Sequence, residues 1–104
     1  MTKSLRIHRL AEDELADVAS WYEARQTGLG IAFVDLVDKA IAAIQSGVLH
    51  TSPVPGVQAK GARRILLRRY PYSIVLFERK DEIVIVAFAH HSRRPGYWRL
   101  REPE

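Results

Sequence analysis

The stretch that decides the fold runs from residue 62 to residue 90 and reads ARRILLRRYPYSIVLFERKDEIVIVAFAH. It contains three runs rich in β-branched and aromatic residues, at residues 62–69, 72–79 and 83–90. Pro71 separates the first run from the second, and the polar sequence KDE at 80–82 separates the second from the third. Such short links favour neighbouring antiparallel strands, so the stretch predicts a three-stranded meander.

Two helices are expected before the meander. Residues 10–25 carry apolar side chains at helical spacing behind an acidic first turn, which favours the start of a helix. After the short link QTGLG, a second apolar stripe extends over residues 29–48, and its members are Leu29, Phe33, Leu36, Val37, Ala40, Ile41, Ile44 and Val48. Two helices joined by so short a link form an antiparallel hairpin.

The remaining segments complete an α+β fold. Residues 47–61 contain proline and glycine without any periodicity, so this segment is expected to be a loop. A short run at residues 4–8 is expected to add a fourth strand. The sequence thus predicts a single domain over residues 1–104 in the order βααβββ, with the helical hairpin packed on one face of an antiparallel meander sheet.

Composition limits the classes of protein that this chain can belong to. The absence of cysteine excludes disulfides and thiolate metal sites, and this fits a reducing cytoplasm. No apolar run is long enough for a signal peptide or a membrane span, so a cytoplasmic protein without membrane association is expected. The four histidines have no acidic cluster near them in the sequence, and GLGIAF lacks the lysine and the preceding strand of a nucleotide-binding loop. We therefore expect neither a metal ion nor a cofactor.

Positive charge is concentrated in the second half of the chain. Residues 60–104 carry eleven Lys and Arg against five acids, whereas residues 1–59 carry five against seven. In the first meander strand, alternation places Arg63, Ile65, Leu67 and Arg69 on one face and Arg64, Leu66 and Arg68 on the other. This pattern predicts an open, electropositive sheet surface suited to nucleic acid or to an acidic protein. Two other interpretations stay open, a solvated basic face without a ligand and edge arginines that protect the strand from aggregation.

The segment HHSRRPGYWR at residues 90–99 directly follows the most apolar strand and is the main candidate for a site. Cleavage of RNA through its own 2′-hydroxyl needs a base, cations to stabilise the phosphorane, and an acid for the leaving oxygen. Histidine, arginine and tyrosine of this segment could supply these three parts. The same residues could instead bind phosphates without reacting, or form a cap in which Tyr97 and Trp98 pack on the sheet.

Three motifs carry a family resemblance: WYEARQTGLGIAF at residues 21–33, RRILLRRYPYSIVLF at 63–77 and VIVAFAHHSRRPGYWRLR at 84–101. Their order and spacing, over nearly the whole chain, are similar to those of the RelE/ParE toxin family of bacterial plasmid stabilisation proteins. The resemblance implies the toxin of a type II toxin-antitoxin pair, neutralised by a labile, cotranscribed antitoxin. It further implies that an acidic, amphipathic tail of the antitoxin wraps the basic sheet of the toxin.

The family uses two mechanisms on one fold, and the fold alone does not decide between them. RelE-like members cut mRNA at the ribosome, whereas ParE-like members block DNA gyrase. WYE in the first helix and RRPGYW near residue 97 are similar to the ParE branch, and only Lys60 precedes the first meander strand where the nucleases are rich in lysine. The resemblance therefore implies growth inhibition through DNA gyrase. The alternatives are a ribosome-dependent mRNA endoribonuclease, and a module that retains only antitoxin binding.

The two mechanisms imply different site residues. A nuclease would draw its catalytic set from Arg63, Arg69, His90, His91, Arg93 and Tyr97, and these groups would have to converge on one face of the sheet. The candidates for contact with the antitoxin or the target are Arg64, Arg68, Arg94, Trp98 and Arg99. A gyrase inhibitor needs no such convergence, and its exposed helical hairpin or C-terminal segment would matter more.

Overall fold

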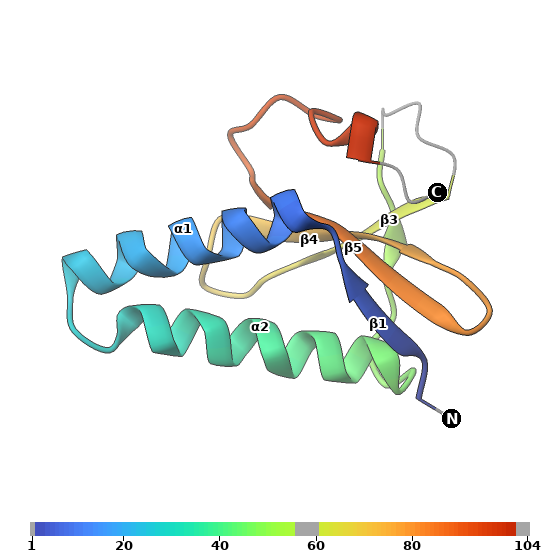
Figure 1. Cartoon of the computed structure of the whole chain (residues 1–104), viewed down its shortest axis with the longest axis horizontal. Helices are drawn as coiled ribbons and strands as arrows, with labels where there is room; N and C mark the ends of the chain where they lie inside the picture. Colours follow the sequence, from blue (N-terminus) through green and yellow to red (C-terminus); the bar gives the residue numbers. More distant parts are fainter. Residues whose placement is uncertain (1, 56–60, 102–104) are drawn as a thin grey trace.

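The computed structural model describes residues 2–55 and 61–101. Its elements are β1 (Ser4–Ile7), α1 (Arg9–Arg25), α2 (Leu29–Gln45), β2 (Ser52–Pro53), β3 (Ala62–Leu66), β4 (Tyr72–Glu78), β5 (Glu82–His90) and the 3₁₀ helix η1 (Arg99–Arg101). The α+β class, the helical hairpin and the order of the predicted elements are confirmed (Figure 1). The two-residue strand β2 is an addition, because it lies in the segment predicted as a loop.

The strands form one mixed sheet in the order β1-β5-β4-β3-β2. β3, β4 and β5 pair antiparallel, which confirms the meander. β1 is the predicted fourth strand. It pairs parallel with β5, and Leu5 lies opposite Ile83. The sheet is therefore mixed, with an antiparallel meander and one parallel strand at the edge. β4 already occupies one edge of β5, so β1 lies at the other edge, and there it runs in the same direction as β5.

Strand β3 ends at Leu66, three residues before its predicted end. The backbone turns after this point, and Arg69 adopts φ 70°, a conformation that is uncommon outside glycine. Leu67 closes the turn by donating its backbone N–H to the Tyr72 carbonyl (3.0 Å). Ile65 and Leu67 pack into the same core cluster, so the predicted alternation holds for the apolar residues of this strand.

The link between the two helices is closed by Glu23. Its carboxylate accepts hydrogen bonds from the backbone N–H groups of Gly28 (2.8 Å) and Gly30 (3.0 Å), which are the free donors at the start of α2. Gly28 has φ 94°, which favours glycine. A side chain at Gly30 would collide with the carbonyl oxygen of Ala19, so the close approach of α1 and α2 also requires glycine.

The helical hairpin covers one face of the sheet. The buried side chains of α2 are Phe33, Val37, Ile41 and Ile44, and they share a core with Ile74, Leu76, Ile83, Ile85 and Phe88 of β4 and β5. Val48, the last member of the predicted stripe, is instead 79% exposed. α2 ends at Gln45, and Gly47 adopts φ 80°, so the helix stops about one turn earlier than the spacing indicated.

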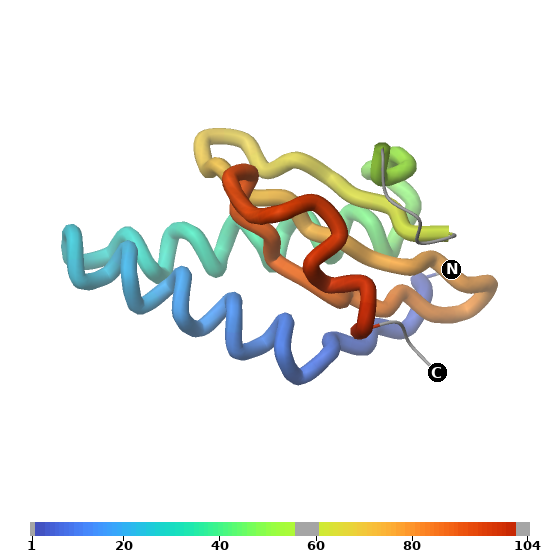
Figure 2. Tube along the Cα trace, turned by 90° about the horizontal axis from the view of Figure 1, so that it is seen from above, coloured from blue at the N-terminus to red at the C-terminus, as the bar shows by residue number. Residues whose placement is uncertain are grey.

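The opposite face of the sheet is buried by the chain after β5. Trp98 (2% exposed) lies in a second core cluster with Ala62, Val75, Val84, Val86 and Ala87, and a β-bulge at Val86 turns both Val86 and Ala87 to this side. The C-terminal segment lies opposite the helices in Figure 1 and crosses in front of the strands in Figure 2. The expected open, electropositive sheet surface is therefore wrong for β4 and β5. Tyr97 and Trp98 pack on the sheet instead, as the cap interpretation predicted.

Candidate functional site

The C-terminal segment forms one wall of a hollow of about 200 Å³ on the second face of the sheet. We call it the C-terminal hollow, and its polar lining comes from Arg64 on β3, Ser73 on β4, His90 at the end of β5, and His91, Arg93, Arg94 and Tyr97 after it. Among the residues that the structure describes, no acidic side chain lines this hollow. The hollow is therefore a concentration of positive charge and hydrogen-bond donors.

His91 is held in place by contacts with β4 and the β3–β4 turn. Its Nε2 lies 3.0 Å from the hydroxyl of Ser73, which is only 4% exposed. Its backbone N–H donates to the Pro71 carbonyl (2.8 Å). The neighbouring His90 is directed differently, because its ring packs edge-on against Tyr72 at 4.9 Å and its Nδ1 accepts the backbone N–H of Ser92 (3.0 Å).

Tyr97 lies between two guanidinium groups. Arg93 is 4.0 Å and Arg101 is 5.2 Å from the centroid of its ring, both within the range of cation–π attraction. The phenol donates a hydrogen bond of 2.7 Å to Oε2 of Glu14 in α1. Burial raises the pKa of Tyr97 above its ordinary value, and the hydrogen bond and the charge of Glu14 raise this pKa further. Tyr97 is thus a poor proton donor whose hydroxyl already has an acceptor.

Glu14 joins three parts of the fold, and we call these contacts the Glu14 cluster. Its Oε1 accepts the backbone N–H of Phe88 (3.1 Å) and lies 2.8 Å from Nη1 of Arg101, while its Oε2 accepts from Tyr97. Arg101 also donates to the Val86 carbonyl (3.2 Å). β1 pairs with β5 only as far as Ile85, so Glu14 satisfies a donor on β5 beyond the end of β1. The cluster fixes the C-terminal segment to α1 and β5.

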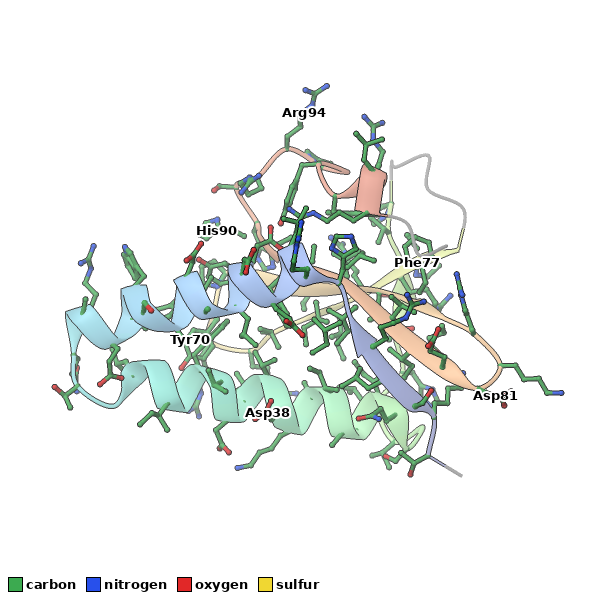
Figure 3. The ribbon with its side chains drawn as sticks, in the orientation of Figure 1. Asp38, Tyr70, Phe77, Asp81, His90 and Arg94 are labelled. Atoms are coloured by element: carbon green, nitrogen blue, oxygen red, sulfur yellow. The ribbon has the colours of Figure 1, made fainter. Side chains whose placement is uncertain are left out.

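The structure brings together only part of the predicted catalytic set. His90, His91, Arg93 and Tyr97 line the C-terminal hollow. Figure 3 shows His90, at the end of β5. Arg63 is turned away from it, because its Nε and Nη2 donate to the side chain and the carbonyl of Thr51, each at 2.6 Å. Arg69 lies in the β3–β4 turn beside α2. The convergence required of a nuclease is therefore incomplete.

The predicted binding residues are also divided. Arg64 and Arg94 line the hollow, and the side chain of Arg94 points outward to solvent in Figure 3. Trp98 lines it too, but its ring belongs to the core. Arg68 lies beside Arg69 near α2, and Arg99 is exposed on η1. These two arginines do not reach the hollow.

Two functional groups were missed by the sequence reasoning, Glu14 and Ser73. Glu14 follows Ala11 by three positions and precedes Val18 by four, so it lies on the buried stripe of α1. A carboxylate on an apolar stripe signals a buried partner. Ser73 occupies an inward position of β4 between Tyr72 and Ile74, where a polar side chain likewise needs a partner.

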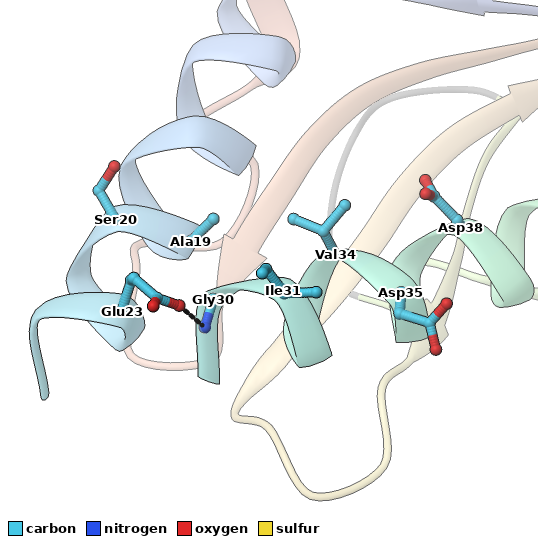
Figure 4. A pocket seen from close by; sticks show the side chains of 8 residues that line it. All are labelled: Ala19, Ser20, Glu23, Gly30, Ile31, Val34, Asp35 and Asp38. Carbon is cyan, nitrogen blue, oxygen red and sulfur yellow. Dashed lines mark hydrogen bonds between the residues drawn. The ribbon is translucent and has the colours of Figure 1, made fainter. Parts of the chain in front are cut away.

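A second surface lies between the two helices. It is a groove of about 660 Å³. Figure 4 shows the residues that line it, Ala19, Ser20, Glu23, Gly30, Ile31, Val34, Asp35 and Asp38, and the hydrogen bond from Gly30 to Glu23. Ile31 is 74% exposed. Asp35 forms an ion pair with Lys39 (2.9 Å) on the outer side of α2. In charge and chemistry this acidic and apolar groove is the opposite of the C-terminal hollow.

Within residues 2–55 and 61–101, no three metal-ligating side chains come together. No helix in these ranges has the length and apolar character needed to cross a membrane.

Comparison with known structures assigns the fold to a class. A chain from the chromosomal ParDE TA system of P. aeruginosa superposes with a TM-score of 0.68, and the match covers 86% of this chain and 96% of that chain at 22% sequence identity. This likeness shows a shared small α+β fold. No curated protein matches the sequence significantly.

The family follows from the sequence itself. The model of the ParE toxin of type II toxin-antitoxin systems matches residues 5–95, so the chain belongs to the ParE toxin family. The resemblance to the RelE/ParE superfamily is confirmed, and the ParE branch is the one that matches.

Proposed function

We propose that this type II toxin stops growth by acting on DNA gyrase in the cytoplasm and is kept inactive by a cognate antitoxin. The observation that carries the choice of gyrase over the ribosome is the state of Tyr97. A ribosome-dependent nuclease needs an acid for the leaving oxygen, whereas the Tyr97 hydroxyl donates to Glu14 and its pKa is raised. Membership of the ParE toxin family supports the same choice.

The positions of Arg63 and Arg69, outside the C-terminal hollow, support a mechanism without cleavage. Arg63 is bound to Thr51, and Arg69 lies beside α2, so neither is placed to stabilise a phosphorane at the C-terminal hollow. A toxin that binds its target and blocks it needs surfaces rather than an assembled acid and base. The helical groove and the C-terminal segment both offer exposed surface for that purpose.

The surface around the hollow suits the expected antitoxin, a chain with an acidic, amphipathic tail. Outside the hollow, Arg99 provides an exposed positive charge, and Leu66 and Leu100 are exposed apolar side chains. An acidic segment with apolar residues at intervals would satisfy both features, and it would order as it binds. The fraction of toxin that is neutralised then depends on the concentration of free antitoxin.

The test is an assay with purified toxin, gyrase, ATP and relaxed plasmid, with supercoiling and linear DNA followed on a gel. We expect inhibited supercoiling and an accumulation of linear DNA. A parallel reaction contains ribosomes stalled on a defined mRNA, with the ends of the mRNA mapped. No effect on gyrase at large molar excess, together with cleavage of the mRNA, would overturn the proposal in favour of the endoribonuclease.

A further inference from the structure

We propose that the C-terminal hollow binds a phosphate group of a nucleic-acid backbone and does not cut it. The inference deepens the proposed function and rests on it for its biological meaning, because gyrase holds DNA while the toxin acts. The physical claim about the site is independent of gyrase.

Within residues 2–55 and 61–101, no carboxylate neutralises the arginines around the hollow. Arg64 and Arg94 form no ion pair with any described residue, and Arg93 contacts only the face of an aromatic ring. By contrast, Arg6 and Arg101, which lie outside the hollow, are each paired with a glutamate. Arginines that lie together without a carboxylate partner are typical of an anion site.

The donors reach the hollow from separate parts of the chain. Arg64 comes from β3, and Arg93 and Arg94 come from the segment after β5. A phosphate diester presents its acceptor oxygens in several directions, so it can accept from donors on different sides at once. A carboxylate also pairs with guanidinium groups, but its two acceptor oxygens lie in one plane. The arrangement therefore favours phosphate over the side chain of an acidic peptide.

The floor of the hollow provides a fixed hydrogen-bonding pair rather than a reactive one. The Ser73 hydroxyl and the His91 imidazole bind each other at 3.0 Å, and Ser73 is almost fully buried. Tyr97 beside them already donates its proton to Glu14. The site can thus hold and orient a phosphate, while its tyrosine is not free to serve as the acid for the leaving oxygen.

The position of Arg94 suits a backbone longer than one phosphate. Its side chain extends from the rim of the hollow into solvent (Figure 3), where it can reach a neighbouring phosphate of the same strand. Phosphate contacts of this kind position a protein on DNA without reading its sequence. We therefore expect binding that depends on salt and not on base sequence.

The test uses the full chain and a short fluorescein-labelled DNA duplex of mixed sequence, with fluorescence anisotropy measured over a range of salt concentrations. The variant Arg64→Gln/Arg94→Gln removes two charges at the hollow. The control Arg25→Gln/Lys80→Gln removes two exposed charges outside the hollow, and Lys80 lies at the opposite end of β4 and β5. Thermal unfolding of both variants checks that the fold is intact.

We expect the hollow variant to bind the duplex about tenfold more weakly or worse, and its salt slope to fall by about 2. The control should lose clearly less. An equal loss in both variants would show that general positive charge attracts DNA, and would overturn the proposal. Absence of any binding at low salt would overturn it as well.

Two competitors separate the sources of negative charge. Polyglutamate that displaces the duplex as well as unlabelled DNA does, at equal charge, would assign the hollow to an acidic peptide and refute the proposal. Inorganic phosphate that binds as tightly as the duplex would refute the nucleic-acid source.

The gyrase assay is run separately on the unmodified chain. DNA binding without gyrase inhibition would refute the proposed target and leave the site, whereas inhibition without DNA binding would refute the site alone.

Discussion

Replacing Glu14 with glutamine removes the one negative charge that holds α1, β5 and the C-terminal segment together. The glutamine can still accept the backbone N–H of Phe88, but it has only one acceptor oxygen for the three donors that meet there. Arg101 is left with most of its side chain buried, at 15% exposed, and without a carboxylate. Breaking a buried ion pair on one side costs about 3–5 kcal/mol. Because the glutamine amide keeps part of the hydrogen bonding, we expect Glu14→Gln to lower the free energy of unfolding by about 3 kcal/mol.

The assay is urea denaturation followed by circular dichroism. With an m-value of about 1.5 kcal/mol per molar urea, the midpoint should fall by about 2 M. The control is Asp17→Asn, an exposed acid one turn further along α1, which should change stability by less than about 0.5 kcal/mol. In a double-mutant cycle with Arg101→Met, the two losses should add to more than the loss of the double variant. A loss below about 1 kcal/mol for Glu14→Gln, or additive losses in the cycle, would refute the role of the Glu14 cluster.

Two further predictions concern the core and the pH dependence of stability. Phe33→Ala should destabilise the fold by about 3–5 kcal/mol in the same urea assay, since the ring is fully buried between α2 and the sheet. A loss below about 1 kcal/mol would mean that α2 packs on the sheet with another face. The pKa of Tyr97 is raised in the folded chain, so Tyr97 ionises at lower pH in the unfolded chain than in the folded one. The contribution of the protonated Tyr97 to the free energy of unfolding is therefore complete below pH 10 and is lost as the pH rises through the folded pKa. Tyr97→Phe should therefore be less stable than the unmodified chain near neutral pH, and the difference should shrink above pH 10; a constant difference across that range would contradict the assignment.

The elements of this fold could be predicted because their signals are local. Phe33, Val37, Ile41 and Ile44 repeat at helical spacing, and the three β-rich runs are separated by turn sequences, so neither depends on distant parts of the chain. The end of α2 was placed too late because Val48 continues the apolar spacing after Gly47 has already ended the helix. A single glycine with positive φ outweighs one more apolar residue in the stripe.

The burial of the second sheet face was not predicted, because the arginines of β3 were taken to represent the whole sheet. Its arginines indicate an open surface, and β3 does lie next to the edge of the sheet, paired only with the two-residue β2 on its outer side. β4 and β5 are the central strands, and the almost continuous apolar run of β5 is the pattern of a strand buried on both faces. Contacts that join distant residues, such as Glu14 with Tyr97, have no local signal beyond the misplaced polarity of one partner.

The parallel pairing of β1 with β5 determines when the chain can fold during synthesis. Ser4 cannot pair until Glu82 has been synthesised, and Glu14 cannot accept its hydrogen bond until Phe88 has been synthesised. Contacts between such distant residues slow folding, because the loop between them must close first. Until β5 emerges, the apolar stripe of the helices lacks Ile83, Ile85 and Phe88, which cover part of it in the folded chain. Translation that stops before residue 82 therefore leaves this stripe partly uncovered, which makes the truncated chain a substrate for chaperones and proteases.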